Sequence, residues 1–150
     1  MPRLDQEFVY KRFINSNFFH YNRGIEPFDD GSLSWFPDFY QDDNRAFVLD
    51  AKYRKADKVF CSDDVVQIVA YMHILKASIG AFIYPAKDSE QVNNVVKNLV
   101  GSGGSVCSFF LKIPSCNSFR EFKEKIKKNE KDFLGQVDET IAILRNKFCS

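Results

Sequence analysis

The sequence predicts an α/β sandwich in which helices cover a small mixed sheet. Segments with helical periodicity alternate along the chain with short apolar runs that are typical of strands. The chain has 150 residues, the length of one domain. Its composition is 45% hydrophobic and 27% charged, as in globular proteins, which excludes extensive disorder. We therefore expect a single domain over residues 1–150.

The first part of the chain is expected to hold one helix and two strands. Apolar residues near a helical period predict a helix over Leu4–Asn15. A segment rich in Asn, Gly, Asp and Pro then predicts turns around a short strand near Phe18–Tyr21. Residues Leu33–Tyr40 are typical of a strand. Because Pro37 cannot donate to a sheet ladder, that strand is expected at a sheet edge or at a bulge.

The next segment predicts a hairpin and then a helix. Residues Gln41–Arg45 have the composition of a turn. Ala46–Tyr53 begins with a continuous apolar run, which is typical of a strand covered on both faces. A helix over about Asp64–Ser78 follows, capped by Ser62 or Asp63. Its apolar stripe consists of Val65, Ile68, Met72 and Leu75.

Strands and helices are expected to alternate through the rest of the chain. Gly80 is expected to end the preceding helix, and Ala81–Tyr84 is typical of a short buried strand. A helix over Glu90–Val100 is expected next, with Gly101–Ser105 as its exit loop. Val106–Ile113 predicts another strand.

A long helix is expected to close the chain. Ser118 and Glu121 match a capping box, in which two side chains satisfy the first backbone donors of a helix. Apolar residues then keep one face over several turns: Phe119, Phe122, Ile126, Phe133, Val137, Ile141, Leu144 and Phe148.

Charge and cysteine content narrow the function classes. With 21 Lys and Arg against 20 Asp and Glu, the formal charge of +1 excludes a histone-like protein but permits nucleic-acid binding through a local basic face. The chain contains neither an apolar run of membrane-spanning length nor an N-terminal secretion signal, so we expect a cytoplasmic protein without a membrane partner. The four cysteines are widely spaced, which favours free thiols over a zinc or iron–sulfur site.

Three charged residues are expected to meet at one end of the predicted hairpin. Asp38 lies in its first strand, and Asp50 and Lys52 lie in its second. Residues two apart in a strand point to the same face, so Asp50 and Lys52 should share one. If Asp38 faces them across the pair, two carboxylates and one ammonium converge.

Two carboxylates placed together are unfavourable unless a cation neutralises them. Hard divalent cations take oxygen ligands, so Mg²⁺ or Mn²⁺ is the expected cofactor, with phosphate and water completing the coordination. Such a metal polarises a phosphoryl oxygen. Lys52 could orient or deprotonate the attacking water, or stabilise charge on phosphorus. These groups suit hydrolysis of a phosphodiester.

The pattern resembles a known family. The residues that carry the resemblance are Pro37, Asp38, Asp50, Ala51, Lys52, Gln67 and Tyr71. Together they resemble the signature of the PD-(D/E)XK nuclease superfamily, and the QxxxY spacing looks like its RecB/Cas4-type branch. The strings FVLDAKYRK, DDVVQIVAYMHIL and GAFIYP are most similar to the nuclease subunit of McrBC-type and LlaJI-type restriction systems. The resemblance covers roughly Leu4–Pro85.

The resemblance implies a restriction-endonuclease-like fold and a Mg²⁺-dependent DNA endonuclease or exonuclease. Asp38 and Asp50 would then ligate the metal, assisted by the Ala51 carbonyl and by Glu7, an acidic residue in the first predicted helix. Lys52 would then activate water, while Gln67 and Tyr71 would position metal-bound phosphate or a nucleotide. In McrBC-like systems the nuclease works with a separate motor NTPase, and other domains choose the target.

Phosphate contacts and partner proteins are also expected. Arg54 and Lys55 follow the catalytic strand, where they could bind phosphate or simply be solvated. Candidate partners are DNA, a motor NTPase or target-recognition subunit, and a second copy of the chain. The chain is too short to include a target-recognition domain, so we expect a fragment or a protein that acts through a partner. The alternative is a catalytically inactive nucleic-acid-binding or assembly module with the same fold.

Overall fold

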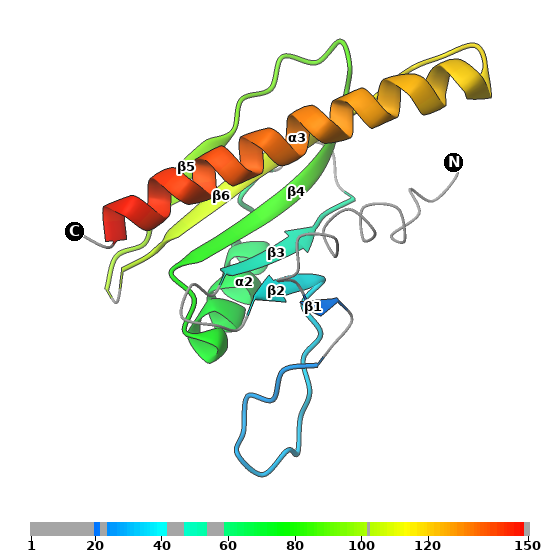
Figure 1. Cartoon of the computed structure of the whole chain (residues 1–150). Helices are drawn as coiled ribbons and strands as arrows, with labels where there is room; N and C mark the ends of the chain where they lie inside the picture. The colour runs from blue at the N-terminus through cyan, green and yellow to red at the C-terminus, as the bar shows by residue number, and fades with distance from the viewer. Residues whose placement is uncertain (1–19, 22–23, 42–46, 54–58, 102, 149–150) are drawn as a thin grey trace.

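A six-stranded mixed sheet forms the centre of the computed structural model (Figure 1), which describes every residue except 1–19, 22–23, 42–46, 54–58, 102 and 149–150. Its strands lie in the order β1-β2-β3-β4-β6-β5. Strands β3, β4 and β6 run parallel, and the other pairs are antiparallel. The elements are β1 (His20–Tyr21), β2 (Phe39–Gln41), β3 (Phe47–Ala51), α2 (Ser62–Leu75), β4 (Ile79–Lys87), β5 (Val95–Asn98), β6 (Ser105–Ile113) and α3 (Phe119–Phe148).

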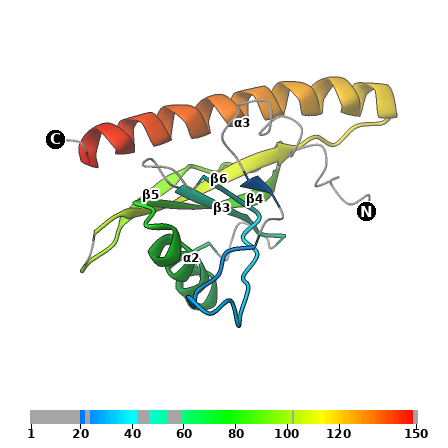
Figure 2. The same ribbon diagram turned by 60° about the horizontal axis from the view of Figure 1, so that its bottom comes forward.

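Two helices cover opposite faces of the sheet, which confirms the predicted α/β sandwich (Figure 2). The alternation of side chains along β3 shows why both layers are needed. Phe47 and Leu49 are buried in the core under α3, whereas Val48 is buried in the core under α2. The apolar run of β3 therefore has one face for each helix, as predicted for a doubly covered strand.

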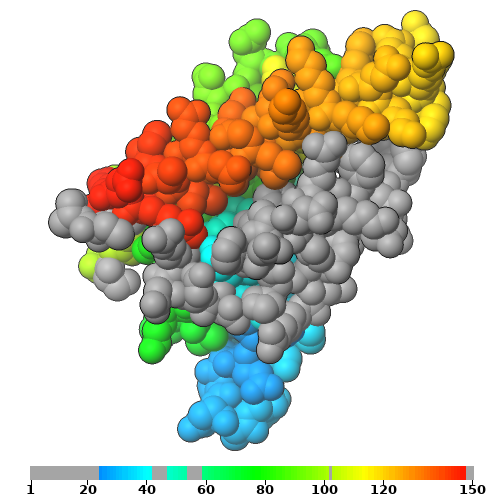
Figure 3. All heavy atoms as spheres, viewed as in Figure 1, coloured from blue at the N-terminus to red at the C-terminus, as the bar shows by residue number. Residues whose placement is uncertain are grey.

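The strand predicted over Leu33–Tyr40 is much shorter in the structure. Strand β2 begins only at Phe39, and Trp35 pairs with Ile25 in an isolated antiparallel bridge. Pro37 lies buried between the two and has no N–H to offer a ladder. The segment before β2 projects away from the sheet (Figure 1, Figure 3). The expected edge position is wrong for β2, because β1 pairs with its outer side in the described sheet.

Helix α2 is confirmed, but its predicted ends are wrong. Cys61, rather than Ser62 or Asp63, occupies the N-cap position, and no side chain caps the helix there. At the other end Lys76 adopts a left-handed conformation with φ 53°, and backbone N–H groups at the cap donate to the carbonyls of His73 and Met72. The helix thus ends before the predicted boundary at Ser78.

Gly80 lies inside β4 rather than at the end of α2. A Cβ atom at this position would come within 2.6 Å of Met72 Sδ and 2.9 Å of Ile68 Cγ1. The glycine therefore permits close packing of the strand beneath the helix. Strand β4 also continues past Tyr84 through Pro85. The carbonyl of Ile83 accepts a hydrogen bond from the backbone N–H of Lys52, on the β3 side of the strand. Because residues two apart in a strand face the same neighbour, the Pro85 nitrogen, which has no N–H, lies on the β3 side and not toward β6.

The helix predicted over Glu90–Val100 is wrong. Residues Val95–Asn98 form β5, which pairs with β6 and has all four residues exposed. The β-branched pair Val95 and Val96 suits an extended backbone. The predicted exit loop joins two strands instead: Leu99 donates from its backbone to the Gly104 carbonyl at 2.9 Å, and Gly104 has φ +98°.

The final helix α3 starts as its capping box predicts. The backbone N–H of Glu121 donates to Ser118 Oγ at 3.2 Å. Five members of its apolar stripe pack into the core: Ile126, Phe133, Val137, Ile141 and Leu144. The prediction is wrong for Phe119, which was expected in this stripe but is 80% exposed at the start of the helix.

Several expectations fall where the structure gives no description: the helix over Leu4–Asn15, the turn after Gln41 and the thiol of Cys149. In the described part of the chain, Cys107 and Cys116 are free thiols, as predicted. Burial raises the pKa of Cys107 to about 12, so this thiol stays protonated at neutral pH. None of the helices in the described part of the chain is long and apolar enough to span a membrane.

Candidate active site at the end of strand β3

Asp38 and Asp50 meet at the edge of the sheet where β3 ends. Phe39 pairs with Leu49 in an antiparallel register, so Asp38, one residue earlier, lies opposite Asp50, one residue later. Asp38 lies one residue before β2 rather than inside it, which corrects the predicted placement. Its Oδ2 atom accepts a hydrogen bond from the Ala51 backbone N–H at 2.8 Å. This bond holds the segment before β2 against the end of β3.

Asp50 is a buried carboxylate, with only 7% of its surface exposed. Burial raises its pKa, and so do the negative charges of Asp38 and Asp64. The hydrogen bond and charge of Lys52 act in the opposite direction but do not reverse the shift. A negative charge at Asp50 is therefore energetically costly in the protein alone.

Lys52 follows β3 directly and continues its pairing, because its backbone N–H donates to the Ile83 carbonyl at 2.8 Å. Its side chain consequently lies on the same face as Asp50, as predicted from the spacing of two. The Nζ atom is 2.5 Å from Asp50 Oδ2 and donates to Gln67 Oε1 at 2.8 Å. It also lies 5.9 Å from the centre of the Phe82 ring.

Helix α2 brings Gln67 and Tyr71 to the same site. It forms the crossover between the parallel strands β3 and β4, which places it over the face that carries Asp50. Gln67 Nε2 donates to the Tyr71 hydroxyl at 3.2 Å, so the two side chains share one face of the helix as predicted. An unbroken hydrogen-bonded path therefore runs from Lys52 through Gln67 to Tyr71.

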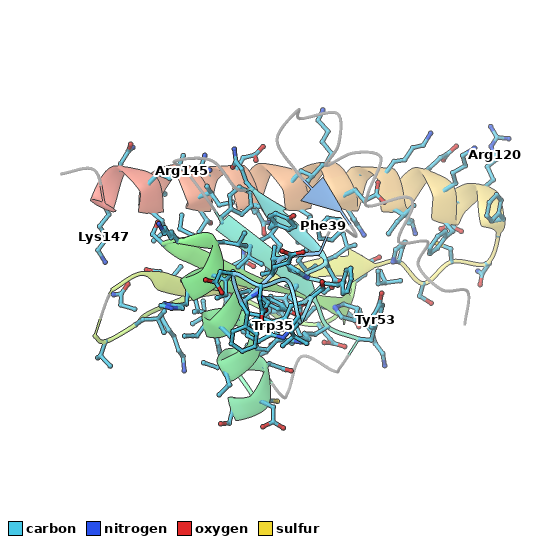
Figure 4. The ribbon with its side chains drawn as sticks, turned by 90° about the horizontal axis from the view of Figure 1, so that it is seen from below. Trp35, Phe39, Tyr53, Arg120, Arg145 and Lys147 are labelled. Carbon is cyan, nitrogen blue, oxygen red and sulfur yellow. The ribbon has the colours of Figure 1, made fainter. Side chains whose placement is uncertain are left out.

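Tyr71 is buried between the site and an aromatic neighbour. Its ring lies 6.1 Å from that of Trp35, which sits on the side of the sheet covered by α2 (Figure 4). Burial raises the pKa of Tyr71, and the charges of Asp50 and Asp38 raise it further. The phenol therefore stays protonated at neutral pH and can donate a hydrogen bond.

Asp64 also belongs to this site, although in the sequence it only marks the start of a predicted helix. It is 4% exposed, and its Oδ1 atom lies 3.4 Å from Lys52 Nζ. A signal was present in the sequence, because Asp64 precedes Gln67 by three residues and so lies on the same side of α2.

The surrounding carboxylates keep Lys52 protonated. Burial alone would lower its pKa, but the hydrogen bond to Asp50 and the charges of Asp50 and Asp64 outweigh burial and raise it. At neutral pH this lysine is a cation that can donate hydrogen bonds and stabilise negative charge.

The donor chemistry of the site suits a hard divalent cation. Asp38, Asp50 and the Ala51 carbonyl offer only oxygen atoms, which Mg²⁺ and Mn²⁺ prefer. Within the described ranges, no group of three or more His, Cys, Asp or Glu side chains is arranged to hold a metal ion. Glu7, the predicted additional ligand, lies outside the described residues, as do Arg54 and Lys55.

Comparison with known proteins identifies similarity over the region that carries the site. Residues 19–85 match the family model described as McrBC 5-methylcytosine restriction system component. All five of the catalytic residues inferred from the sequence fall within this range: Asp38, Asp50, Lys52, Gln67 and Tyr71. No curated protein matches the chain by sequence similarity.

A solved structure shares the fold. A chain from the refined half-complex of a tetradecameric assembly of Thermococcus gammatolerans McrB AAA+ hexamers with bound McrC superposes with a TM-score of 0.61 at 17% sequence identity. The alignment covers 91% of the present chain and 33% of that chain, so the present chain spans about a third of its length. The likeness supports the restriction-endonuclease-like α/β sandwich.

Proposed function

We propose that the chain is a metal-dependent DNA nuclease that hydrolyses phosphodiester bonds as the cleavage part of an McrBC-type restriction system. The observation that carries the proposal is the convergence of Asp38, Asp50 and Lys52 at one sheet edge, with Gln67 bonded to the lysine. The family match over residues 19–85 supports the same assignment.

Asp38 and Asp50 would hold the metal. Their carboxylates are opposed across the ends of β2 and β3, and a cation bound between them would offset the burial and the charge of Asp38 that raise the pKa of Asp50. A divalent cation bound there polarises a phosphoryl oxygen and acidifies water. Asp38 has a second task, because its hydrogen bond to Ala51 fixes the backbone that carries the neighbouring carbonyl.

Lys52 acts as a charge stabiliser in this proposal. Of the roles open to it from the sequence, a proton acceptor fits least, because its neighbours raise its pKa. A fixed ammonium instead donates to a non-bridging phosphate oxygen and stabilises the negative charge that grows there as water attacks phosphorus and before the leaving oxygen departs. The Gln67 amide oxygen orients the ammonium of Lys52, and the Tyr71 hydroxyl accepts a hydrogen bond that holds the Gln67 amide in place.

A partner completes the system. The matched solved structure contains McrB AAA+ hexamers with bound McrC, and the present chain spans a third of the matched chain. We extend the proposal to a motor NTPase that delivers DNA to this site. Target choice would lie with other domains or subunits, since the described residues form one compact sandwich around a single sheet.

Metal binding distinguishes this function from a non-catalytic module with the same fold. Mn²⁺ or Mg²⁺ that binds the folded state should raise the melting temperature, by an amount that grows with metal concentration. Na⁺ at matched ionic strength and a chelator serve as controls for non-specific ionic effects. A melting temperature that is insensitive to both metals would favour the binding or assembly module.

A further inference from the structure

Lys52 lies between two carboxylates that come from different elements. Asp50 approaches it from β3 with Oδ2 at 2.5 Å, and Asp64 approaches from the first turn of α2 with Oδ1 at 3.4 Å. Both acids are buried, with 7% and 4% of their surfaces exposed. The arrangement thus offers the ammonium two alternative anionic partners.

Of Asp50 and Asp64, the proposed metal site uses only Asp50. If Asp50 donates its carboxylate to a divalent cation, that oxygen is shared with a stronger positive charge, and its hold on Lys52 weakens. A neutral amide such as that of Gln67 can direct the ammonium but cannot balance its charge. Among these side chains, Asp38 and Asp50 together balance a divalent cation, and Asp64 balances Lys52.

On the basis of the proposed function, we propose that Asp64 is the positioning residue that keeps Lys52 at the site once Asp50 binds the metal. Its place on α2 suits this task, because a carboxylate in the first turn of a helix is stabilised by the helix dipole. The same helix carries Gln67, so one rigid element sets both the charge and the direction of the ammonium.

The activity test compares Asp64→Asn and Asp64→Glu with Asp63→Asn, a matched control on an exposed neighbouring residue. In plasmid nicking with Mn²⁺, Asp64→Asn should lower kcat at least tenfold while KM for DNA stays unchanged. It should also keep the Mn²⁺-dependent rise in melting temperature, since Asp64 is not a ligand. Asp64→Glu should recover part of kcat, and Asp63→Asn should match the wild type.

A second readout needs neither metal nor cleavage. The melting temperatures of Asp64→Asn, Lys52→Met and the double variant should be non-additive in metal-free protein. The departure from additivity should increase in an Asp50→Asn background, where Asp64 is the remaining anionic partner of Lys52 among these side chains.

Three results would overturn the assignment of Asp64: additive melting temperatures in the Asp50→Asn background, a wild-type kcat for Asp64→Asn, or loss of its Mn²⁺ shift. The last result would make Asp64 a metal ligand. A wild-type protein that cuts no plasmid would instead contradict the proposed nuclease function. In that case the metal-free cycle still decides whether Asp64 holds Lys52.

Discussion

Lys52 Nζ lies 2.8 Å from Gln67 Oε1, so one hydrogen bond joins the strand end that carries the acids to the helix that covers it. The two residues are 15 positions apart in the sequence. With its amide oxygen bonded to Lys52 and its amide nitrogen bonded to Tyr71, Gln67 acts here as a bridge within the site. The bridge therefore couples the strand end that carries Asp50 and Lys52 to the helix face that carries Gln67 and Tyr71.

Asp50→Asn should stabilise the metal-free protein. The substitution keeps the shape of the side chain but removes a buried charge that lies near Asp38 and Asp64. A gain of about 1 kcal/mol would raise the melting temperature of a domain of this size by roughly 2–4 °C. Differential scanning calorimetry in a chelator measures the change, with Asp63→Asn as control. A lower melting temperature would mean that the ion pair with Lys52 outweighs the cost of burial.

The same carboxylate should control the pH dependence of stability. Because the folded state raises the pKa of Asp50 above its ordinary value of 3.8, the folded chain keeps this proton to a higher pH than the unfolded chain. Stability is therefore lost as pH rises from 3.8 through the folded pKa. The stability advantage of Asp50→Asn should be smallest below pH 3.8 and reach a plateau above the folded pKa. Urea unfolding across this range measures it, and a pH-independent difference would contradict the assignment.

Lys52→Ala should separate metal binding from catalysis. Removing the ammonium leaves the carboxylate of Asp50 more available, so the Mn²⁺-dependent rise in melting temperature should persist or increase. Cleavage should fall by orders of magnitude, because the group that stabilises charge in the transition state is gone. Lys127→Ala, on the exposed face of α3, is the matched control. If Lys52→Ala loses both properties, the lysine is structural.

Gln67→Ala and Tyr71→Phe should each lower activity with little effect on stability. If the Gln67 bond to Lys52 is stronger in the transition state than in the free protein by about 1.5–3 kcal/mol, the range for hydrogen bonds to charged groups, its loss should cost roughly tenfold to a hundredfold in kcat/KM. Tyr71→Phe removes a neutral bond of about 0.5–1.5 kcal/mol and should cost roughly two- to tenfold. Steady-state kinetics with calorimetry tests both. Wild-type kinetics for Gln67→Ala would show that the bridge has no catalytic role.

The sequence predicted those parts of the fold and site that depend on local pattern. The apolar run before Asp50 indicated a strand covered on both faces, and the spacing of two correctly placed Lys52 beside it. The spacing of four between Gln67 and Tyr71 correctly indicated a shared helix face. In each case, regular strand or helix geometry is enough to relate the residues.

The remaining features depend on contacts between distant segments. Val95 and Val96 lie in a strand only because β6 pairs with them, since their own side chains are exposed. Gly80 is required by the approach of α2, which no turn signal in the sequence reports. Asp64 resembles a solvated helix-start acid until Lys52 from β3 is placed against it.

Nicking of supercoiled plasmid DNA in Mn²⁺, measured for the wild type and for Asp50→Asn, tests the central claim most directly. We expect the wild type to convert supercoiled plasmid to open-circular and linear forms, a chelator to stop the reaction, and Asp50→Asn, although folded, to be inactive. A folded wild type that leaves the plasmid intact, or an Asp50→Asn protein that cuts at the wild-type rate, would contradict it.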